Sequence, residues 1–111
     1  MSYTVRMTAK AEQDLIEAVD YIALTLFNPQ AADDLLHRVE DAVGKLTLMP
    51  KKHKIVDDPV LAAWEIRLIV VERYLVFYRV DEEANTVIIL RFLYEKRHWM
   101  SIFQNEPMPA F

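Results

Sequence analysis

The alternation of apolar and polar residues is clearest in the second half of the chain. Three apolar runs, at residues 64–70, 74–80 and 87–94, are separated by short polar breaks. Runs rich in β-branched and aromatic residues with such short connections predict consecutive antiparallel strands. Residues 3–7 alternate in the same way and predict a further, half-buried strand at the start of the chain.

Between these regions, apolar residues recur at spacings of three and four, which predicts two amphipathic helices. Thr8 is expected to cap the first helix, and Asn28-Pro29 to begin the second, which has to end before Pro50. The short connection favours an antiparallel helical hairpin whose apolar stripes cover the sheet. The acidic residues of the first helix are expected on a solvated face: Glu12, Asp14, Glu17 and Asp20.

The element order β-α-α-β-β-β therefore predicts an α+β fold. We expect a small antiparallel sheet, formed by the N-terminal strand and the three-strand meander, with the helical hairpin covering one face. At 111 residues the chain suffices for one domain, spanning 1–111, with a single core. The one glycine, Gly44, falls inside the second helix, where it costs about 1 kcal/mol relative to alanine. A close contact between helices would explain it.

Composition narrows the classes of function. The absence of cysteine excludes disulfides and thiolate metal sites, and a single glycine excludes a glycine-rich phosphate loop. His37, His53 and His98 show no metal-site spacing, so neither a metal nor another cofactor is expected. No signal peptide or membrane-spanning run is recognisable, which predicts a cytoplasmic protein without a membrane partner.

The net charge of −4 resides in the first half of the chain. Residues 1–50 hold 4 Lys and Arg against 8 Asp and Glu, whereas residues 51–111 hold 9 of each kind. Overall acidity argues against non-specific nucleic-acid binding, which requires a positive field. A local basic site in the second half remains compatible with this distribution.

One arginine interrupts each predicted strand of the meander: Arg67, Arg79 and Arg91. An arginine within an apolar strand is costly unless it is paired or faces water. If all three project from the uncovered face of the sheet, that face is cationic. Pairing with Glu65 or with the acids at 81–83 is the competing explanation.

Two further clusters carry candidate chemistry. The basic segment Lys51-Lys52-His53-Lys54 could touch a polyanion, although a solvated connection explains it equally well. The last strand ends in the segment YEKRHW at 94–99, where Lys96 and Arg97 could stabilise charge on a phosphate. There, His98 could act as general acid or base. A charged strand end with an interfacial tryptophan is the structural alternative.

The element order and three segments resemble the RelE/ParE superfamily of toxins: NPQAA at 28–32, RYLVFYRVD at 73–81 and VIILRFLY at 87–94, followed by EKRHW. The resemblance covers residues 3–103. It implies a toxin of a type II toxin–antitoxin module, held inactive by a cognate antitoxin whose C-terminal segment wraps around it. The antitoxin would add a strand to a sheet edge or lay an amphipathic helix into an apolar groove, with acidic residues facing residues 91–99.

The superfamily divides by target. RelE-like members cleave mRNA in the ribosomal decoding site without a metal, and this is the leading hypothesis, with the ribosome and its mRNA as partner. The implied catalytic residues are Arg67, Arg91, Arg97 and His98. The implied RNA-binding residues are Lys51, Lys52, Lys54, Arg73, Arg79 and Lys96. An arginine expected late in the first meander strand is replaced by Val70, and a C-terminal tyrosine by Phe103; Arg67 and His98 are the candidate substitutes.

ParE-like members instead inhibit DNA gyrase, lack the catalytic set and carry a longer helical hairpin like the one expected here. In that alternative, DNA gyrase is the target and the basic residues belong to a protein-binding surface. A third alternative is a degenerate member that binds only its antitoxin.

Overall fold

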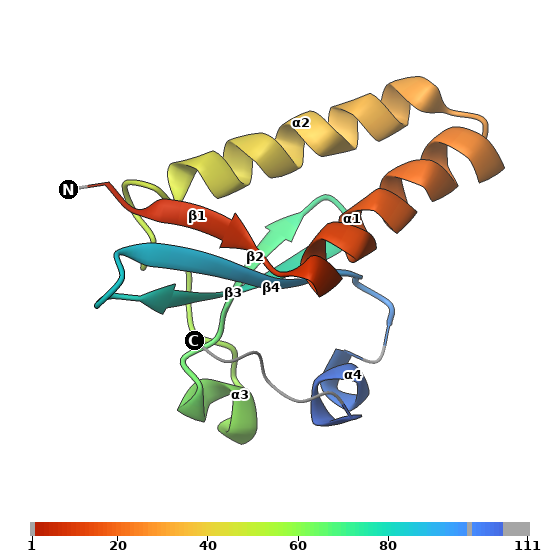
Figure 1. The fold of residues 1–111 in the computed structure, drawn as a ribbon. Coiled ribbons are helices and arrows are strands. Elements are labelled where there is room, and N and C mark those ends of the chain that lie inside the picture. Colours follow the sequence, from red (N-terminus) through yellow and green to blue (C-terminus); the bar gives the residue numbers. More distant parts are fainter. Residues whose placement is uncertain (1, 98, 106–111) are drawn as a thin grey trace.

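The computed structural model describes residues 2–97 and 99–105 as an α+β fold in which helices lie above and below a four-stranded sheet (Figure 1). The elements in chain order are β1 (Thr4–Met7), α1 (Ala9–Asp20), the π-helical turn η1 (Tyr21–Thr25), α2 (Pro29–Lys45), α3 (Pro59–Ala63), β2 (Arg67–Val71), β3 (Tyr74–Asp81), β4 (Thr86–Tyr94) and α4 (Trp99–Asn105). The predicted fold class and the order β-α-α-β-β-β are confirmed. The short helices α3 and α4 are additions that the pattern did not indicate.

The sheet has the strand order β1-β4-β3-β2 and is mixed rather than wholly antiparallel. The meander β2-β3-β4 is antiparallel, as predicted, whereas β1 runs parallel to β4, with Val5 opposite Val87. Parallel neighbours require a long crossover, and the chain between β1 and β4 supplies it. The hairpin of α1 and α2 is the first part of that crossover.

Local signals position the two long helices as expected. The Thr8 side chain accepts a hydrogen bond from the backbone N–H of Ala11, and Asn28 accepts one from Ala31, both at 3.1 Å. Pro29 opens α2, which ends at Lys45, before Pro50. Within the described part of the chain, no helix is long and apolar enough to cross a membrane.

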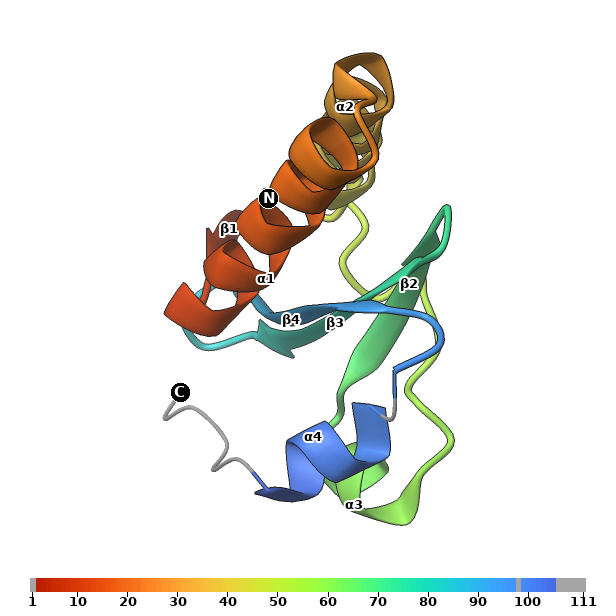
Figure 2. The same ribbon diagram turned by 90° about the vertical axis from the view of Figure 1, so that its right-hand side faces the viewer.

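Helices lie on both sides of the sheet (Figure 2). Each face carries an apolar cluster, so the expectation of a bare second face is wrong. On one face, α1 and α2 pack against a cluster that includes Leu35, Val76 and Ile89. On the other, the residues between α2 and β2 and the helix α4 enclose a second cluster. Its buried members are Val56, Leu61, Ile66, Phe77, Leu90 and Leu93.

A β-bulge in β4 changes which residues share a face. The pairing with β3 steps from Phe77–Arg91 to Tyr78–Ile89, which leaves Leu90 as an extra residue. Phe92 therefore joins the hairpin-side cluster instead of the opposite face that strict alternation predicts. The strand β3 has no extra residue, and its side chains alternate strictly as its pattern predicts: Val76 and Tyr78 belong to the hairpin-side cluster and Phe77 to the opposite one.

The first strand of the meander is shorter than predicted. It begins at Arg67, because Trp64 closes α3 as its C-cap and Glu65 takes a left-handed φ of 56°. A left-handed residue interrupts an extended strand. The apolar run at 64–70 thus spans a helix end, a turn and a strand.

We predict that Gly44→Ala raises the free energy of unfolding by roughly 0.5–1 kcal/mol. No atom lies within 4 Å of a Cβ added at this position, so the close helix contact that would explain the glycine is absent. Chemical denaturation of the two proteins measures the change. A decrease would show that the glycine is needed for its backbone conformation.

Candidate functional site

Three hydrogen bonds converge on the carboxylate of Asp14 and fasten α1 to β4. Arg91 donates from Nε to Oδ2 at 2.7 Å and from Nη2 to Oδ1 at 2.9 Å, and the backbone N–H of Phe92 donates to Oδ2 at 3.1 Å. The two side chains keep only 10% (Arg91) and 9% (Asp14) of their surface exposed. The expectation that Asp14 lies on a solvated face is therefore wrong.

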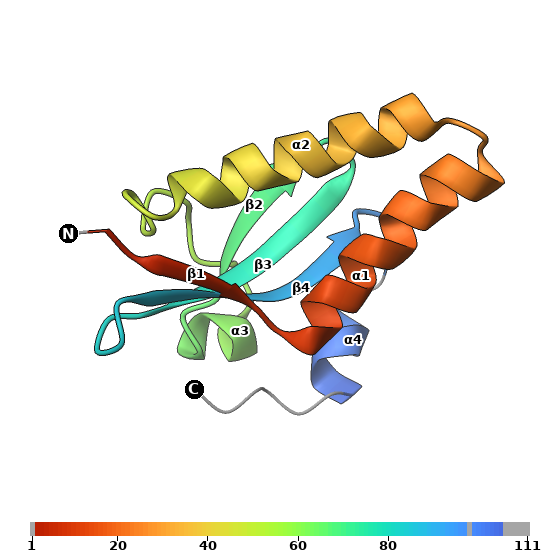
Figure 3. The same cartoon turned by 45° about the horizontal axis from the view of Figure 1, so that its top comes forward.

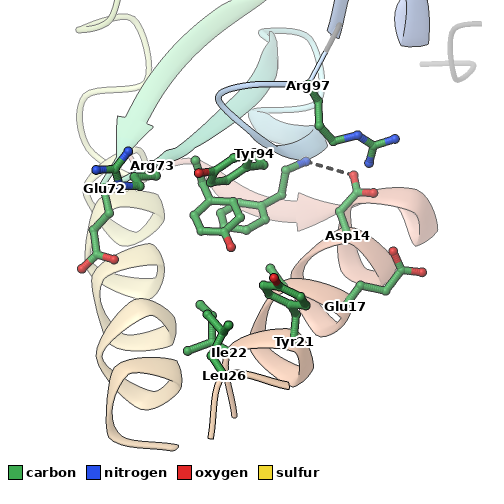
Figure 4. Close-up of a pocket in the computed structure, with 12 residues that line it drawn as sticks. Asp14, Glu17, Tyr21, Ile22, Leu26, Glu72, Arg73, Tyr94 and Arg97 are labelled. Carbon is green, nitrogen blue, oxygen red and sulfur yellow. Dashed lines mark hydrogen bonds between the residues drawn. The ribbon is translucent and has the colours of Figure 1, made fainter. Parts of the chain in front are cut away.

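A groove of about 720 Å³ opens beside this ion pair, between the helical hairpin and the end of the sheet (Figure 4). We call it the hairpin groove. Its apolar and aromatic lining comprises Ala18, Tyr21, Ile22, Leu26, Tyr74, Phe92 and Tyr94. The rings of Tyr74 and Phe92 stack with centroids 4.8 Å apart, and Tyr94 meets Tyr74 edge-on at 5.6 Å. The groove thus offers a continuous aromatic surface.

Charged side chains surround this aromatic surface. Arg73 and Glu72 lie on one side of the groove and Arg97 and Glu17 on the other (Figure 4). Burial raises the pKa of the Tyr74 phenol, and neighbouring Tyr94 and Glu72 raise it further. The phenol consequently stays protonated at neutral pH and can donate a hydrogen bond. An apolar floor with a charged rim suits an amphipathic helix.

A second group of cations lies around a separate polar hollow of about 370 Å³, which Lys51, Arg67 and Arg79 share with acidic residues. Arg67 donates to the backbone carbonyl of His53 at 2.6 Å, and Arg79 donates from Nε to that of Trp64 at 3.0 Å. Lys51 forms an ion pair with Glu82. Each of these two arginines therefore holds a backbone carbonyl of a neighbouring segment.

The basic segment 51–54 is fastened to the sheet. Besides the hydrogen bond from Arg67, the buried Tyr78 hydroxyl donates to the carbonyl of Pro50 at 2.7 Å. Partial burial, aided by the charge of Lys52, lowers the pKa of His53. Lys52 and Lys54 stay exposed.

The cations named from the sequence do not form a single constellation. Arg73 and Arg97 border the hairpin groove, Arg91 is paired with Asp14, and Lys51, Arg67 and Arg79 line the polar hollow. Lys96 is exposed, and His98 lies outside the described residues. The catalytic and RNA-binding assignments stay predictions. Among the described residues, no three His, Cys, Asp or Glu side chains are grouped to hold a metal ion.

Sequence reasoning missed Asp14 and the aromatic lining of the groove. Asp14 looks like any acid of an exposed helix face, and its partner is distant in the chain. The one available signal was Arg91 in an apolar strand, since a buried arginine needs a hydrogen-bonding or charged partner. The residues that line the groove could not be predicted from the sequence, because the bulge in β4 moves Phe92 to the hairpin side of the sheet.

Comparisons with known proteins agree with this architecture. A family model described as ParE toxin of type II toxin–antitoxin system, parDE, matches residues 5–99. Similar solved structures include the chromosomal ParDE system from P. aeruginosa, 20% identical over 84% of this chain and 96% of that chain, with a TM-score of 0.67. Another is the toxin–antitoxin complex RelBE2 from Mycobacterium tuberculosis, which is 29% identical over 85% of this chain and 99% of that chain, with a TM-score of 0.59. No curated protein matches the chain.

We predict that Asp14→Ala lowers the free energy of unfolding by about 3–5 kcal/mol, because it leaves the buried charge of Arg91 unpaired. Urea denaturation measures the loss. The matched control is Glu95→Ala, which breaks the exposed pair with Arg73 and should cost less than about 1 kcal/mol. Equal losses for the two variants would contradict a central role for the Asp14–Arg91 pair.

Proposed function

The chain belongs to the ParE toxin family of type II toxin–antitoxin systems, and from this premise we propose that it acts by binding and inhibiting DNA gyrase, without catalysis of its own. The observation that carries the proposal is the dispersal of the cations that an RNA-cleaving site would use. The hairpin of α1 and α2 supports the proposal as well, because a longer helical hairpin is expected of ParE-like members.

Cleavage of RNA requires an acid or base and charge-stabilising groups around one phosphate, each within hydrogen-bond reach. Arg91 is held by a buried carboxylate, and Arg67 is engaged with the backbone of a neighbouring segment. Neither residue is among those that line the hairpin groove, which Arg97 borders. Such a distribution favours a binding protein over a nuclease.

Ribosome-dependent mRNA cleavage is the second candidate, and one observation favours it. Lys96 and Arg97 are exposed and follow closely after β4, which ends at the aromatic residue Tyr94. Cations beside an aromatic ring suit contact with single-stranded RNA. Arg97 would then be the residue nearest to a bound phosphate, and His98 would be the acid or base.

A cognate antitoxin is the proposed inhibitory partner, and the hairpin groove is its proposed binding site. Two similar solved structures are described as toxin–antitoxin systems. The aromatic floor of the groove would receive the apolar face of an amphipathic helix. Arg73 and Arg97 at the rim would pair with acidic residues of that helix.

We predict that the double variant Arg73→Glu, Arg97→Glu weakens antitoxin binding at least about tenfold, because like charges then face each other. The measurement is calorimetric titration with the product of the adjacent antitoxin gene. Lys52→Glu, Lys54→Glu makes the same change in charge away from the groove and should bind normally. Equal weakening by both variants would indicate a non-specific effect of net charge.

Inducible expression in a bacterial host, with pulse-labelling of DNA and protein, tests the proposed target. We expect DNA synthesis to fall first, with induction of the DNA-damage response, and His98→Ala to stay fully toxic. A prompt fall in protein synthesis with cut ribosome-bound mRNA, abolished by His98→Ala, would overturn the proposal in favour of mRNA cleavage. Absence of any growth effect would leave the antitoxin-binding role alone.

A further inference from the structure

The connection between α1 and α2 carries an apolar surface that no described residue of the chain covers. Leu24 and Phe27 are 69% and 86% exposed, and Tyr21 and Leu26 are more than half exposed. We call these four residues the hairpin tip. Figure 3 shows that the connection projects beyond the sheet, at the far end from β1. Large apolar side chains on such a projection indicate an interaction site more than a core.

The backbone of the hairpin tip is also unusual. Phe27 adopts a φ of 52°, a left-handed conformation that favours glycine or asparagine and is unfavourable for a bulky residue. The preceding π-helical turn is closed by the N–H of Leu26, which donates to the carbonyl of Tyr21 at 3.0 Å. Such turns are frequent at functional sites. Phe27 thus takes the left-handed position that ends the helix, where glycine is usual, and its large side chain is exposed.

The chain segment that carries the hairpin tip has charged residues of one sign, although the adjoining hairpin groove, which Tyr21 and Leu26 also line, includes Arg73 and Arg97. Residues 11–37 contain six Asp and Glu and no Lys or Arg. Asp14 is neutralised by Arg91, but Asp20, Asp33 and Asp34 are exposed next to the connection. An acidic rim repels nucleic-acid phosphates and attracts a positively charged protein surface.

We propose that the hairpin tip is the surface with which the toxin docks onto its protein target. The target site would be positively charged and would contain an apolar recess that receives Leu24 and Phe27. The unfavourable backbone conformation of Phe27 and the exposed apolar area of the hairpin tip would then be offset by burial of these side chains in the complex. The inference rests on the proposed function in one respect, namely that purified DNA gyrase serves as the probe.

Tyr21 and Leu26 also line the hairpin groove, whereas Leu24 and Phe27 do not. Substitutions at Leu24 and Phe27 can therefore separate target docking from antitoxin binding. A helix lying in the groove would contact Tyr21 and Leu26 of the hairpin tip without resting on Leu24 or Phe27. This adjacency would allow the antitoxin to hide part of the docking surface.

The test is the double variant Leu24→Ser, Phe27→Gly. Glycine relieves the strained φ, so the melting temperature should be unchanged or higher, and antitoxin affinity should stay within about twofold of wild type. Affinity for purified gyrase, measured by biolayer interferometry, should fall at least about tenfold, as for a central apolar anchor. Growth arrest on expression should be lost. Leu48→Ser, at a residue 74% exposed near the other end of α2, is the matched control and should change neither readout.

Retained toxicity and wild-type gyrase affinity in the double variant would overturn the inference. Loss of toxicity, when the wild-type chain itself does not bind gyrase, would support the docking surface and refute gyrase as the target. A wild-type chain that does not arrest growth would refute both the docking surface and gyrase as the target. The variant Asp33→Asn, Asp34→Asn should slow association and weaken its salt dependence; an unchanged rate would refute the charge argument.

Discussion

The buried ion pair between Asp14 and Arg91 is the interaction on which the arrangement of this protein depends. It joins the first helix to the central strand β4 and also holds the backbone N–H of Phe92. The helical hairpin is thereby set at the end of the sheet where the aromatic groove opens. A buried pair adds little net stability, but either partner alone would be an uncompensated charge, so the pair specifies one packing of helix on sheet.

Structural roles that depend on neighbouring residues in the sequence could be predicted. Thr8 and Asn28 cap their helices by hydrogen bonds to nearby N–H groups, and the alternation in β3 depends only on its neighbours. Features that depend on distant partners were not predictable. Asp14 and Arg91 lie 77 residues apart, and the bulge at Leu90 arises from pairing between strands. The burial of Asp14 and the position of Phe92 were missed for this reason, because both depend on contacts between distant parts of the chain.

The surface of the protein separates into regions of different chemistry. Around the polar hollow, Arg67 and Arg79 hold backbone carbonyls of neighbouring segments, whereas Lys52 and Lys54 are exposed. The hairpin groove is aromatic with a mixed rim, and the hairpin tip is apolar and acidic. Two neighbouring binding surfaces, one for an inhibitory partner and one for a target, account for these features with fewer assumptions than a dispersed catalytic site. On this account the toxin acts by occupying a protein, and its arginines serve structure and recognition.

Supercoiling by purified DNA gyrase, with the purified chain added at increasing concentration, is the most direct test of action by binding. The account predicts a dose-dependent loss of supercoiled product, which returns when antitoxin is added. Unimpaired supercoiling, together with cleavage of mRNA on purified translating ribosomes by the same preparation, would contradict it.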